Sequence, residues 1–530
     1  MSTSADIRSG PPTNSEAANP ELVKGLGLTS ATTLVMGSMI GSGIFIVSAG
    51  IAREVNSPGL LIMAWVVTGF MTIVGALSYG ELAAMMPRAG GQYVYLRESL
   101  GPLWGFLYGW TLFLVIQTGT VAAVGVAFGK YLGYFFPAIS ANTWIVHIGN
   151  GPMPVWHITK DIALGGMDVG LNTQNLAAII VVILLTVVNV FGIKTGAAVQ
   201  NVFTIAKVFA LAVLAVAGVF VARNAQAIAA NFGNFWRSGS LHTASGTAAG
   251  PFVGVLTILA VAQVGSLFSS DAWNNVTFTA GEVKNPRRNL PLSLALGTGV
   301  VILLYIAVNF VYLMHLPFDG DPHGTTVISR GIQYATDHPE IAAGKPEDRV
   351  GTAAMLQMFG PAGAALMAVA ILISTFGCCN GLILAGARVY YAMAKDGLFF
   401  KATGAVHPKY HSPRNALMVQ GIWTSVLCLS GTYNDLLNYV IFAVLVFYIL
   451  TIAGLFVLRR TQPQADRPYR AIGYPVLPAI YIVMALFIDV VLLRYQPQYT
   501  WPGLFIVLLG VPVYLIWSRR GGPRLAHNAE

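Results

Sequence analysis

Long apolar stretches separated by short polar segments run along almost the whole chain. A helix needs about 20 apolar residues to cross the hydrocarbon layer of a membrane, and the pattern predicts twelve such helices. Their approximate ranges are 28–52, 59–86, 101–135, 176–194, 201–222, 251–280, 293–316, 361–396, 414–431, 435–458, 474–494 and 501–518. The chain is therefore predicted to be an all-α polytopic membrane protein.

The first apolar stretch is interrupted at its centre by Gly41-Ser42-Gly43. Glycine disfavours a helix interior, so we expect the backbone to leave the helix there. Freed backbone groups in hydrocarbon are tolerated only where they line a cavity or bind a ligand. A second interruption, Ser269-Ser270-Asp271-Ala272, lies in the sixth stretch. Two interrupted spans in corresponding halves indicate the binding site of a transporter.

Composition excludes a soluble domain, because 55% of the residues are hydrophobic, only 10% are charged, and the mean hydropathy is +0.67. Soluble domains carry about 25% charged residues. The net charge of +9 comes from basic residues scattered over short loops. We therefore expect a lipid bilayer and no nucleic acid as the partner of this surface.

The distribution of Lys and Arg predicts which side the loops face. With both termini cytoplasmic, the inner segments carry 20 of the 30 basic residues and the outer segments carry 9, leaving Lys207 inside a span. This two-to-one excess follows the positive-inside rule. The location predicted is the plasma membrane or cell inner membrane, with both termini inside.

The chain divides into two tails and one transporter domain. Residues 1–24 are polar and predict a disordered cytoplasmic tail without a cleavable signal peptide, and 519–530 form a second cytoplasmic tail. Between them, 25–518 is the transporter domain. If the first ten spans divide into two sets of five, the first repeat covers about 28–222, the second about 251–458, and two extra helices about 474–518. The outer loop of about 317–360 is expected to be a lid or a short pair of helices.

Four stretches carry a resemblance to a known family: GSMIGSGIFIVSAGI (37–51), YGELAAMMPRAGGQYVYL (79–96), LFSSDAWNNVTFTAGEVKNPRRNLP (267–291) and TFGCCNGLILAGARVYYAMAKDGL (375–398). They resemble spans one, two, six and eight of the amino acid–polyamine–organocation (APC) superfamily. The combination is most similar to the bacterial relatives of the L-type amino acid transporter (LAT) family. The resemblance implies a LeuT-like fold, which is a five-plus-five inverted repeat with two additional helices. Helices 1 and 6 would be unwound at mid-membrane.

A broken helix can hold both ends of an amino acid zwitterion. Amides at the start of a half-helix and its positive dipole end favour a carboxylate, while carbonyls at the end of a half-helix favour an ammonium. The carboxylate is predicted on the amides of Ser42, Gly43 and Ile44, beside Gly41. The ammonium is predicted on the carbonyls of Met39, Ile40, Phe268, Ser269 and Asp271. The alternative is that Gly-x-Gly serves only close helix packing.

Asp271 is a carboxylate within an apolar span, which is costly and by default functional. It contacts the substrate, holds a proton, caps the second half of the broken helix, or faces a water-filled vestibule. These alternatives stay open from the sequence.

Lys207 lies in the fifth span, within AKVFAL. One interpretation is that it snorkels to the inner surface. The resemblance implies another, in which the ammonium occupies the ion place of sodium-coupled relatives, between spans one and eight near Gly41 and Ser374-Thr375. Transport would then be sodium-independent, and a proton role is conceivable.

Aromatic and polar residues complete the predicted site. The resemblance implies that Phe268 is a gate over bound substrate, with ordinary packing as the alternative. Trp273 lines the pocket or packs in the core, and the polar cluster of 117–120 lines the pocket or joins helices. Opposite charges on the inner loops are predicted to form a cytoplasmic gate: Glu81, Arg88, Arg97, Glu98, Glu282, Lys284 and Asp396.

The sequence predicts a secondary transporter of amino acids that works by alternating access. Sodium-independent exchange of small neutral L-amino acids is favoured, with proton-coupled symport as the alternative. A channel or a transport-inactive sensor is less favoured. We find no catalytic constellation, so no enzyme and no cofactor are expected. No metal is expected either, because the adjacent Cys378 and Cys379 diverge on a helix and no histidine is near them in the sequence.

Animal LAT members bind a single-span glycoprotein through a cysteine between spans three and four. Residues 136–175 of this chain contain no cysteine, and the three cysteines, Cys378, Cys379 and Cys428, lie in apolar spans. No disulfide-linked heavy chain is therefore expected, and the protein should work as a monomer or weak oligomer.

Overall fold

The computed structural model describes residues 22–147, 156–159, 162–164, 169–221, 223–237, 251–338, 348–429 and 433–520. Most of the two predicted tails, residues 1–21 and 521–530, lies outside the described residues. Within the described part, ten helices are long and apolar enough to cross a membrane. They are the broken helix Leu28–Val55, α3 (Pro58–Met85), the run Pro102–Phe135, α7 (Thr173–Val190), α8 (Ile193–Phe220), α12 (Pro286–His315), α14 (Val350–Lys395), α16 (Tyr433–Thr461), α17 (Val476–Tyr495) and α18 (Pro497–Arg520).

The other two predicted spans correspond to one helix whose stretch Gly254–Ser269 is a shorter apolar helix and to one helix of 14 residues. They are α10 (Pro251–Ser269) and α15 (Arg414–Leu427). The run Pro102–Phe135 consists of α5 (Pro102–Thr111), a π-helical turn η1 (Leu112–Ile116) and α6 (Gln117–Phe135). Shorter helices are α4 (Gln92–Leu100), α9 (Ala225–Gly233), α11 (Asn275–Phe278), η2 (Ala280–Glu282), α13 (Val327–Arg330) and η3 (Lys401–Gly404).

The prediction of an all-α chain is wrong for the loop between α6 and α7. Strand β1 (Trp144–His147) pairs antiparallel with β4 (Gly170–Asn172), and β2 (Trp156–Thr159) pairs antiparallel with β3 (Ile162–Leu164). This loop contains β-branched and aromatic residues, which favour extended backbone, and the strands are only three or four residues long. Such short runs fall below what a pattern of periodicity can identify.

The first and sixth apolar stretches are both interrupted where the sequence predicts. Helix α1 (Leu28–Met39) ends four residues before Gly43, where α2 (Gly43–Val55) begins. Helix α10 ends at Ser269, and Ala272 has a φ of 64°, which a right-handed helix cannot accommodate. The sixth stretch does not resume as a long helix up to residue 280, since only α11 and η2 follow.

Helix α14 begins eleven residues before the predicted eighth span, at Val350 and not at 361. It bends at Gly360, which has a φ of 66° and precedes Pro361. The first ten residues of α14 therefore occupy the end of the predicted outer loop. Pro361 has no amide hydrogen to continue the ladder, which places the bend there.

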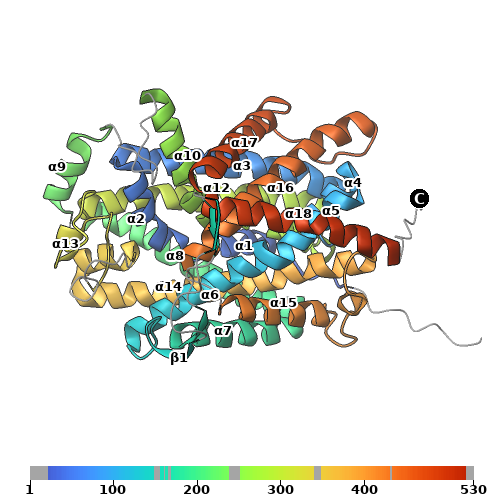
Figure 1. Ribbon diagram of the computed structural model, residues 1–530, viewed down its shortest axis with the longest axis horizontal. Helices are drawn as coiled ribbons and strands as arrows, with labels where there is room; N and C mark the ends of the chain where they lie inside the picture. Colours follow the sequence, from blue (N-terminus) through green and yellow to red (C-terminus); the bar gives the residue numbers. More distant parts are fainter. Residues whose placement is uncertain are drawn as a thin grey trace, which may run out of the picture.

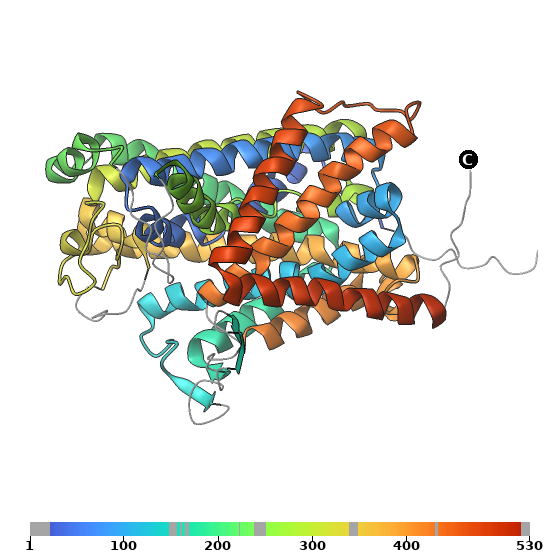
Figure 2. The ribbon, with the colours of Figure 1, turned by 45° about the horizontal axis from the view of Figure 1, so that its top comes forward.

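The long helices lie mostly along the longest axis of the molecule, with α1 among them and not at the rim (Figure 1). Helix α12 packs along α3 and α1, α14 packs against α8 and α6, and α10 packs against α2. Helix α17 crosses the others at a steep angle beside α16 and α18 (Figure 2). The two interruptions therefore lie inside a shell of long helices.

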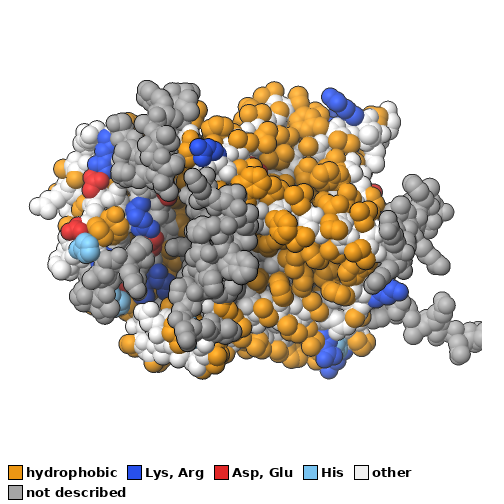
Figure 3. Space-filling view, in the orientation of Figure 1, with side chains coloured by type: hydrophobic (Ala, Val, Ile, Leu, Met, Phe, Trp, Pro, Cys, Tyr) orange, Lys and Arg blue, Asp and Glu red, His pale blue; other side chains and the backbone are white. Residues whose placement is uncertain are grey.

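A broad apolar surface covers the face formed by α16, α17 and α18, and charged side chains gather toward the two ends of the molecule (Figure 3). Val483 and Phe505 on this face are 67% and 62% exposed. An apolar surface of this breadth is expected of a protein surrounded by lipid. The chain is a multi-pass membrane protein.

Candidate functional site

The ammonium group of Lys207 is held at the end of α1. Its Nζ donates hydrogen bonds to the carbonyls of Gly37 (2.6 Å), Ile40 (2.5 Å) and Ser374 (3.3 Å), and the residue is 1% exposed. Three acceptors match the three hydrogens of an ammonium. The interpretation that Lys207 snorkels to the surface is therefore wrong. Its side chain joins α8 to α1 and α14.

Ser374 of α14 satisfies further carbonyls at the first interruption. Its hydroxyl lies 3.1 Å from the Ile40 oxygen and 2.8 Å from the Gly41 oxygen. The last carbonyls of a helix have no partner within the helix. Here Lys207 and Ser374 supply those partners from two neighbouring helices.

A tyrosine of α12 connects the two interruptions. The Tyr305 hydroxyl lies 3.1 Å from the carbonyl oxygens of both Met39 and Ser269, to which it can donate. On the same face of α12, Asn309 accepts a hydrogen bond from Ser48 (2.7 Å), and Tyr312 donates to the Ile44 carbonyl (3.3 Å). Residues 305, 309 and 312 have the i, i+4, i+7 spacing of one helix face. A single polar stripe thus follows the broken first helix.

The two broken helices touch at Gly43. A Cβ atom built on Gly43 would lie 2.1 Å from Ser269 Oγ and 3.0 Å from Ser269 Cα. The Ser269 hydroxyl itself donates to the Gly265 carbonyl (3.0 Å) within α10. Only glycine allows this approach without displacement of a helix.

The amides predicted for a carboxylate lie in the first turn of α2. The Ser42 carbonyl accepts a hydrogen bond from Phe45 (3.1 Å), while the amides of Gly43 and Ile44 do not bond to a carbonyl of α1. First-turn amides lack partners within their own helix. By contrast, the carbonyls of Met39, Ile40 and Ser269 already accept hydrogen bonds from the protein. A carbonyl can accept a second bond, so an ammonium would share or replace these partners.

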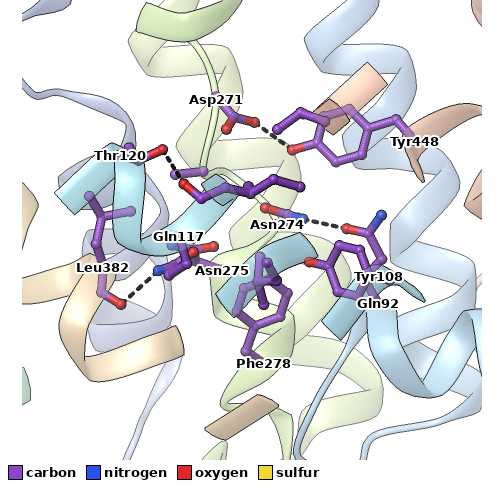
Figure 4. A pocket seen from close by; sticks show the side chains of 14 residues that line it. Gln92, Tyr108, Gln117, Thr120, Asp271, Asn274, Asn275, Phe278, Leu382 and Tyr448 are labelled. Carbon is purple, nitrogen blue, oxygen red and sulfur yellow. Dashed lines mark hydrogen bonds between the residues drawn. The ribbon is translucent and has the colours of Figure 1, made fainter. Parts of the chain in front are cut away.

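Asp271 stands in the second interruption and faces Tyr448 of α16 (Figure 4). The Tyr448 hydroxyl donates to the Asp271 carboxylate over 2.6 Å. The residue at the cap position of α11 is Asn274, so the interpretation of Asp271 as the helix cap is wrong. Its carboxylate is directed across to another helix instead.

Asp271 lines a small cavity between α5, α6, α11 and α16 (Figure 4). The cavity has a volume of about 10 Å³, which is room for about one water molecule. The described conformation therefore has to widen before an amino acid fits beside Asp271.

Two members of the predicted polar cluster line this cavity, namely Gln117 and Thr120. The Gln117 amide donates to the Leu382 carbonyl (2.7 Å), and Asn274 donates to Gln92 (2.8 Å) at the far wall. Thr118 instead bonds to the Phe113 carbonyl of its own helical run (2.6 Å). Gln117, Thr120 and Asn274 thus reach the cavity wall together with Asp271.

The predicted aromatic residues are both buried. Phe268 is 7% exposed in the last turn of α10, and Trp273 is 2% exposed. Trp273 makes an edge-to-face contact with Tyr79 at 4.8 Å. It lines a second cavity, also of about 10 Å³, together with Asp271 and Tyr481. Asp271 therefore borders both cavities.

Ion pairs join the elements at the predicted inner side. Arg388 of α14 pairs with Glu282 over 2.7 Å, and their side chains are 1% and 0% exposed. Glu81 pairs with Arg459 of α16 (2.6 Å), and Arg97 pairs with Asp396. Four of the seven predicted charges, Glu81, Arg97, Glu282 and Asp396, thus form these pairs, and the partners Arg388 and Arg459 were not among those predicted.

Tyr93 lies outside the spans and strengthens the pair of Arg97 and Asp396 by donating to Asp396 (2.7 Å). Burial, together with the neighbouring carboxylate, raises the pKa of the Tyr93 hydroxyl. The hydroxyl therefore keeps its proton and remains a donor.

At the opposite end, Arg53 of α2 pairs with Asp348 over 2.7 Å. Arg237 pairs there with Asp319 over 2.5 Å. Within the described residues, no group of three or more His, Cys, Asp or Glu side chains could hold a metal ion. The three cysteines are free and buried.

Sequence reasoning missed three residues of this arrangement: Tyr305, Tyr448 and Arg388. The available signal for Tyr305 was a polar stripe at helical spacing in an apolar span. Tyr448 and Arg388 gave no such signal, because their partners lie 177 and 106 residues away in the chain.

The chain is similar in sequence to known amino acid transporters. Residues 26–516 match the model of the amino acid permease family. The chain is 29% identical over 511 residues to the large neutral amino acids transporter small subunit 2 of Homo sapiens, covering 96% of this chain and 82% of that protein. It is 28% identical over 508 residues to the serine/threonine exchanger SteT of Bacillus subtilis (strain 168), covering 94% and 98%. It is also 28% identical to the b(0,+)-type amino acid transporter 1 of Mus musculus, covering 93% and 87%. The chain belongs to the amino acid permease family.

Proposed function

We propose that this protein exchanges small neutral L-amino acids across the cytoplasmic membrane without sodium. The observation that carries the proposal is the pair of facing helix interruptions, with the Lys207 ammonium bound to carbonyls of α1 and α14 beside them. Its relatives include an exchanger named for serine and threonine and a transporter named for large neutral amino acids.

The zwitterion would bind across the two interruptions. Its carboxylate would take the amides of Ser42, Gly43 and Ile44, because a helix start favours a negative charge. Its ammonium would take the carbonyls of Met39, Ile40, Phe268, Ser269 and Asp271. The side chain would then point toward the cavity of Gln117, Thr120 and Asp271, with Phe268 as the gate and Trp273 at the border of the second cavity.

Sodium independence rests on Lys207. A sodium ion binds several oxygens at once, and the carbonyls of Gly37, Ile40 and Ser374 form such a group. The ammonium already neutralises these dipoles with a fixed positive charge. A free cation would have to compete with a charge that is tethered in place.

Small substrates are favoured by the residues around the cavity. The second interruption carries Ser269, Ser270 and Ala272, and the cavity holds about one water in the described conformation. A short side chain needs the least widening of this space.

The membrane arrangement is part of the same proposal. The ten long helices, with α10 and α15, would make twelve spans in a LeuT-like five-plus-five inverted repeat, with α17 and α18 added and both termini cytoplasmic. The protein would act as a monomer or weak oligomer without a disulfide-linked heavy chain, since the described cysteines are all buried.

The test is reconstitution into liposomes loaded with serine, threonine, alanine or leucine, followed by uptake of a labelled amino acid. We expect uptake only when an amino acid is inside, at the same rate with sodium or with choline outside. Absence of exchange for the whole panel, or a requirement for sodium, would contradict the proposal.

Proton-coupled symport is the second candidate, because the Asp271 carboxylate borders the cavity and has a hydroxyl partner that could exchange a proton. An inward proton gradient over empty liposomes separates the two. Symport gives uptake into empty vesicles, whereas obligatory exchange gives none.

A further inference from the structure

Helix α17 carries a buried acid that the proposed substrate site does not use. Asp489 is 4% exposed, and neither of its carboxylate oxygens has a hydrogen-bond partner in the described part of the chain. Its neighbours Ile488 and Leu492 are buried, whereas Leu486 and Val490 are 53% and 56% exposed. Asp489 therefore lies on the face of α17 that packs against the protein.

Four helices pack against α17, namely α3, α10, α16 and α18. The titratable or charged side chains described on them and on the turn after α10 are Tyr79, Glu81, Asp271, Tyr448, Arg459, Arg460 and Tyr514. The helix α17 itself adds Tyr481, Arg494 and Tyr495. None of these side chains bonds to Asp489.

The other acids in this group have partners. Glu81 is paired with Arg459 and Arg467, and Asp271 accepts a hydrogen bond from Tyr448. An ionised carboxylate that is buried without such a partner is strongly unfavourable, whereas the neutral acid is tolerated. The environment of Asp489 thus selects the form that carries a proton.

We propose that the carboxyl group of Asp489 is a proton-binding site of this transporter, separate from the substrate cavity, and that loss of its proton slows transport. When α17 repacks so that water reaches the group, the acid releases one proton to water and leaves a carboxylate. Returning that carboxylate to the described packing requires the proton again.

Tyr481 connects this position to the cavities near Asp271. It lies eight residues before Asp489, which is about 12 Å along the helix, and it borders the cavity that Asp271 and Tyr448 also line. Charges inside the protein interior are screened much less than charges at its surface. A charge that appears at Asp489 would therefore change the electrostatic potential at the wall of the substrate region.

Infrared spectroscopy of the purified full chain tests the site without transport. A protonated carboxylic acid gives its own carbonyl band, which disappears when the acid ionises. We expect a band in the unmodified protein near neutral pH that is missing in Asp489→Asn and kept in Asp271→Asn. Identical spectra for the unmodified protein and Asp489→Asn would overturn the proposal, even if exchange itself is confirmed.

Exchange in liposomes with equal pH on both sides tests the consequence for transport. We expect the rate of the unmodified protein to fall at alkaline pH, by up to about tenfold per pH unit for one titrating group. Asp489→Asn should keep its rate there, and Asp489→Glu, which retains an acid, should still lose it. An unchanged pH profile in Asp489→Asn would overturn the proposal. If that variant does not fold, the profile of Asp489→Glu has to shift along the pH axis, and an unshifted profile would also overturn it.

Discussion

The ammonium group of Lys207 lies where carbonyls of two helices converge, and the charge is buried with the residue 1% exposed. A hydrogen bond from a charged group contributes about 1.5–3 kcal/mol. Removing the ammonium leaves the oxygens of Gly37, Ile40 and Ser374 close together without a cation. Those oxygens then resemble the ligand set of a hard cation.

Lys207→Ala should lose most of the basal exchange activity and gain stimulation by sodium, because a free cation can enter the emptied space. Lys207→Met fills the same space with an apolar chain and should stay inactive with or without sodium. Exchange in liposomes with sodium or choline measures both variants. Full activity of Lys207→Ala in choline would contradict the role assigned to the ammonium.

Tyr305→Phe should lower the exchange rate by roughly fivefold to tenfold, since its hydroxyl bonds to Met39 and Ser269 and each such bond contributes about 1 kcal/mol. Tyr312→Phe is the matched control on the same helix face. It removes one longer bond, of 3.3 Å, to the Ile44 carbonyl, and should change the rate less. Equal effects of the two variants would argue against a special link at Tyr305.

At this scale the sequence predicted Lys207 and Asp271 as special, because a charge in an apolar span is conspicuous. The resemblance also implied that Lys207 lies near Gly41 and Ser374, where the structure has it, whereas the contact of Asp271 with Tyr448 could not be predicted. Tyr305 was missed because its signal, a polar stripe at helical spacing, is weak, since a tyrosine in a span is ordinary until its hydroxyl is seen between two carbonyls. Partners at such sequence distances are decided by packing, which no local pattern contains.

Among the elements, the contact between α2 and α10 depends on the absence of one side chain. A larger residue at Gly43 would obstruct more than the amides at the start of α2. In the structure the added carbon would meet the opposite broken helix at Ser269. The glycine therefore serves helix packing as well as the proposed binding of a carboxylate.

Gly43→Ala should destabilise the protein by about 1–3 kcal/mol, the usual range for overpacking a tight contact. The double variant Gly43→Ala with Ser269→Gly removes the opposing Oγ and Cβ and should recover part of the loss. Thermal denaturation in detergent measures each variant, with Gly43→Ala plus Ser270→Gly as the control. Recovery by the control alone would show that the contact is misassigned.

The elements themselves were predicted well where the apolar pattern is long and poorly where it is short. Both interruptions lie where the glycine and serine runs predict. The start of α14 was missed because its first turns, up to the bend at Gly360, lie in the stretch that was predicted as the outer loop. The four strands are three or four residues long, which is too short for an alternation of apolar and polar residues to be recognised in the sequence.

For the molecule as a whole, the buried pair of Arg388 and Glu282 ties α14 to the turn after the second interruption. Both side chains are essentially unexposed. Removing one partner of a buried pair costs about 3–5 kcal/mol because the other charge is left without compensation.

Arg388→Met should therefore lower the melting temperature markedly, and the double variant Arg388→Met with Glu282→Leu should regain most of it. Arg287→Met is the control, since its pair with Asp466 is exposed on both sides (63% and 69%) and such pairs contribute about 0–1 kcal/mol. Thermal denaturation of the full chain measures all three. A similar loss for Arg287→Met would show that burial is not the cause.

For the whole molecule, the sequence predicted the number of apolar stretches and suggested the proposed pairing of halves. The partners in the ion pairs could not be predicted from the sequence, because charges on separate loops carry no sequence signal for their partners. The proton site at Asp489 also needed the structure, because an acid near the end of a span looks like a boundary residue until its surroundings are known.

The backbone bonds just before α1 couple two distant segments of the chain. Leu26, just before α1, pairs with Val283 after η2, and the amides of Gly25 and Leu26 lie 2.8 Å and 3.0 Å from the Glu282 carbonyl. Two chain segments joined this way share their displacement. A tilt of α1 would move the end of the second broken helix with it. Because Glu282 pairs with Arg388, the tilt would also act on α14. On the predicted inner side, α1, η2 and α14 are therefore expected to move together.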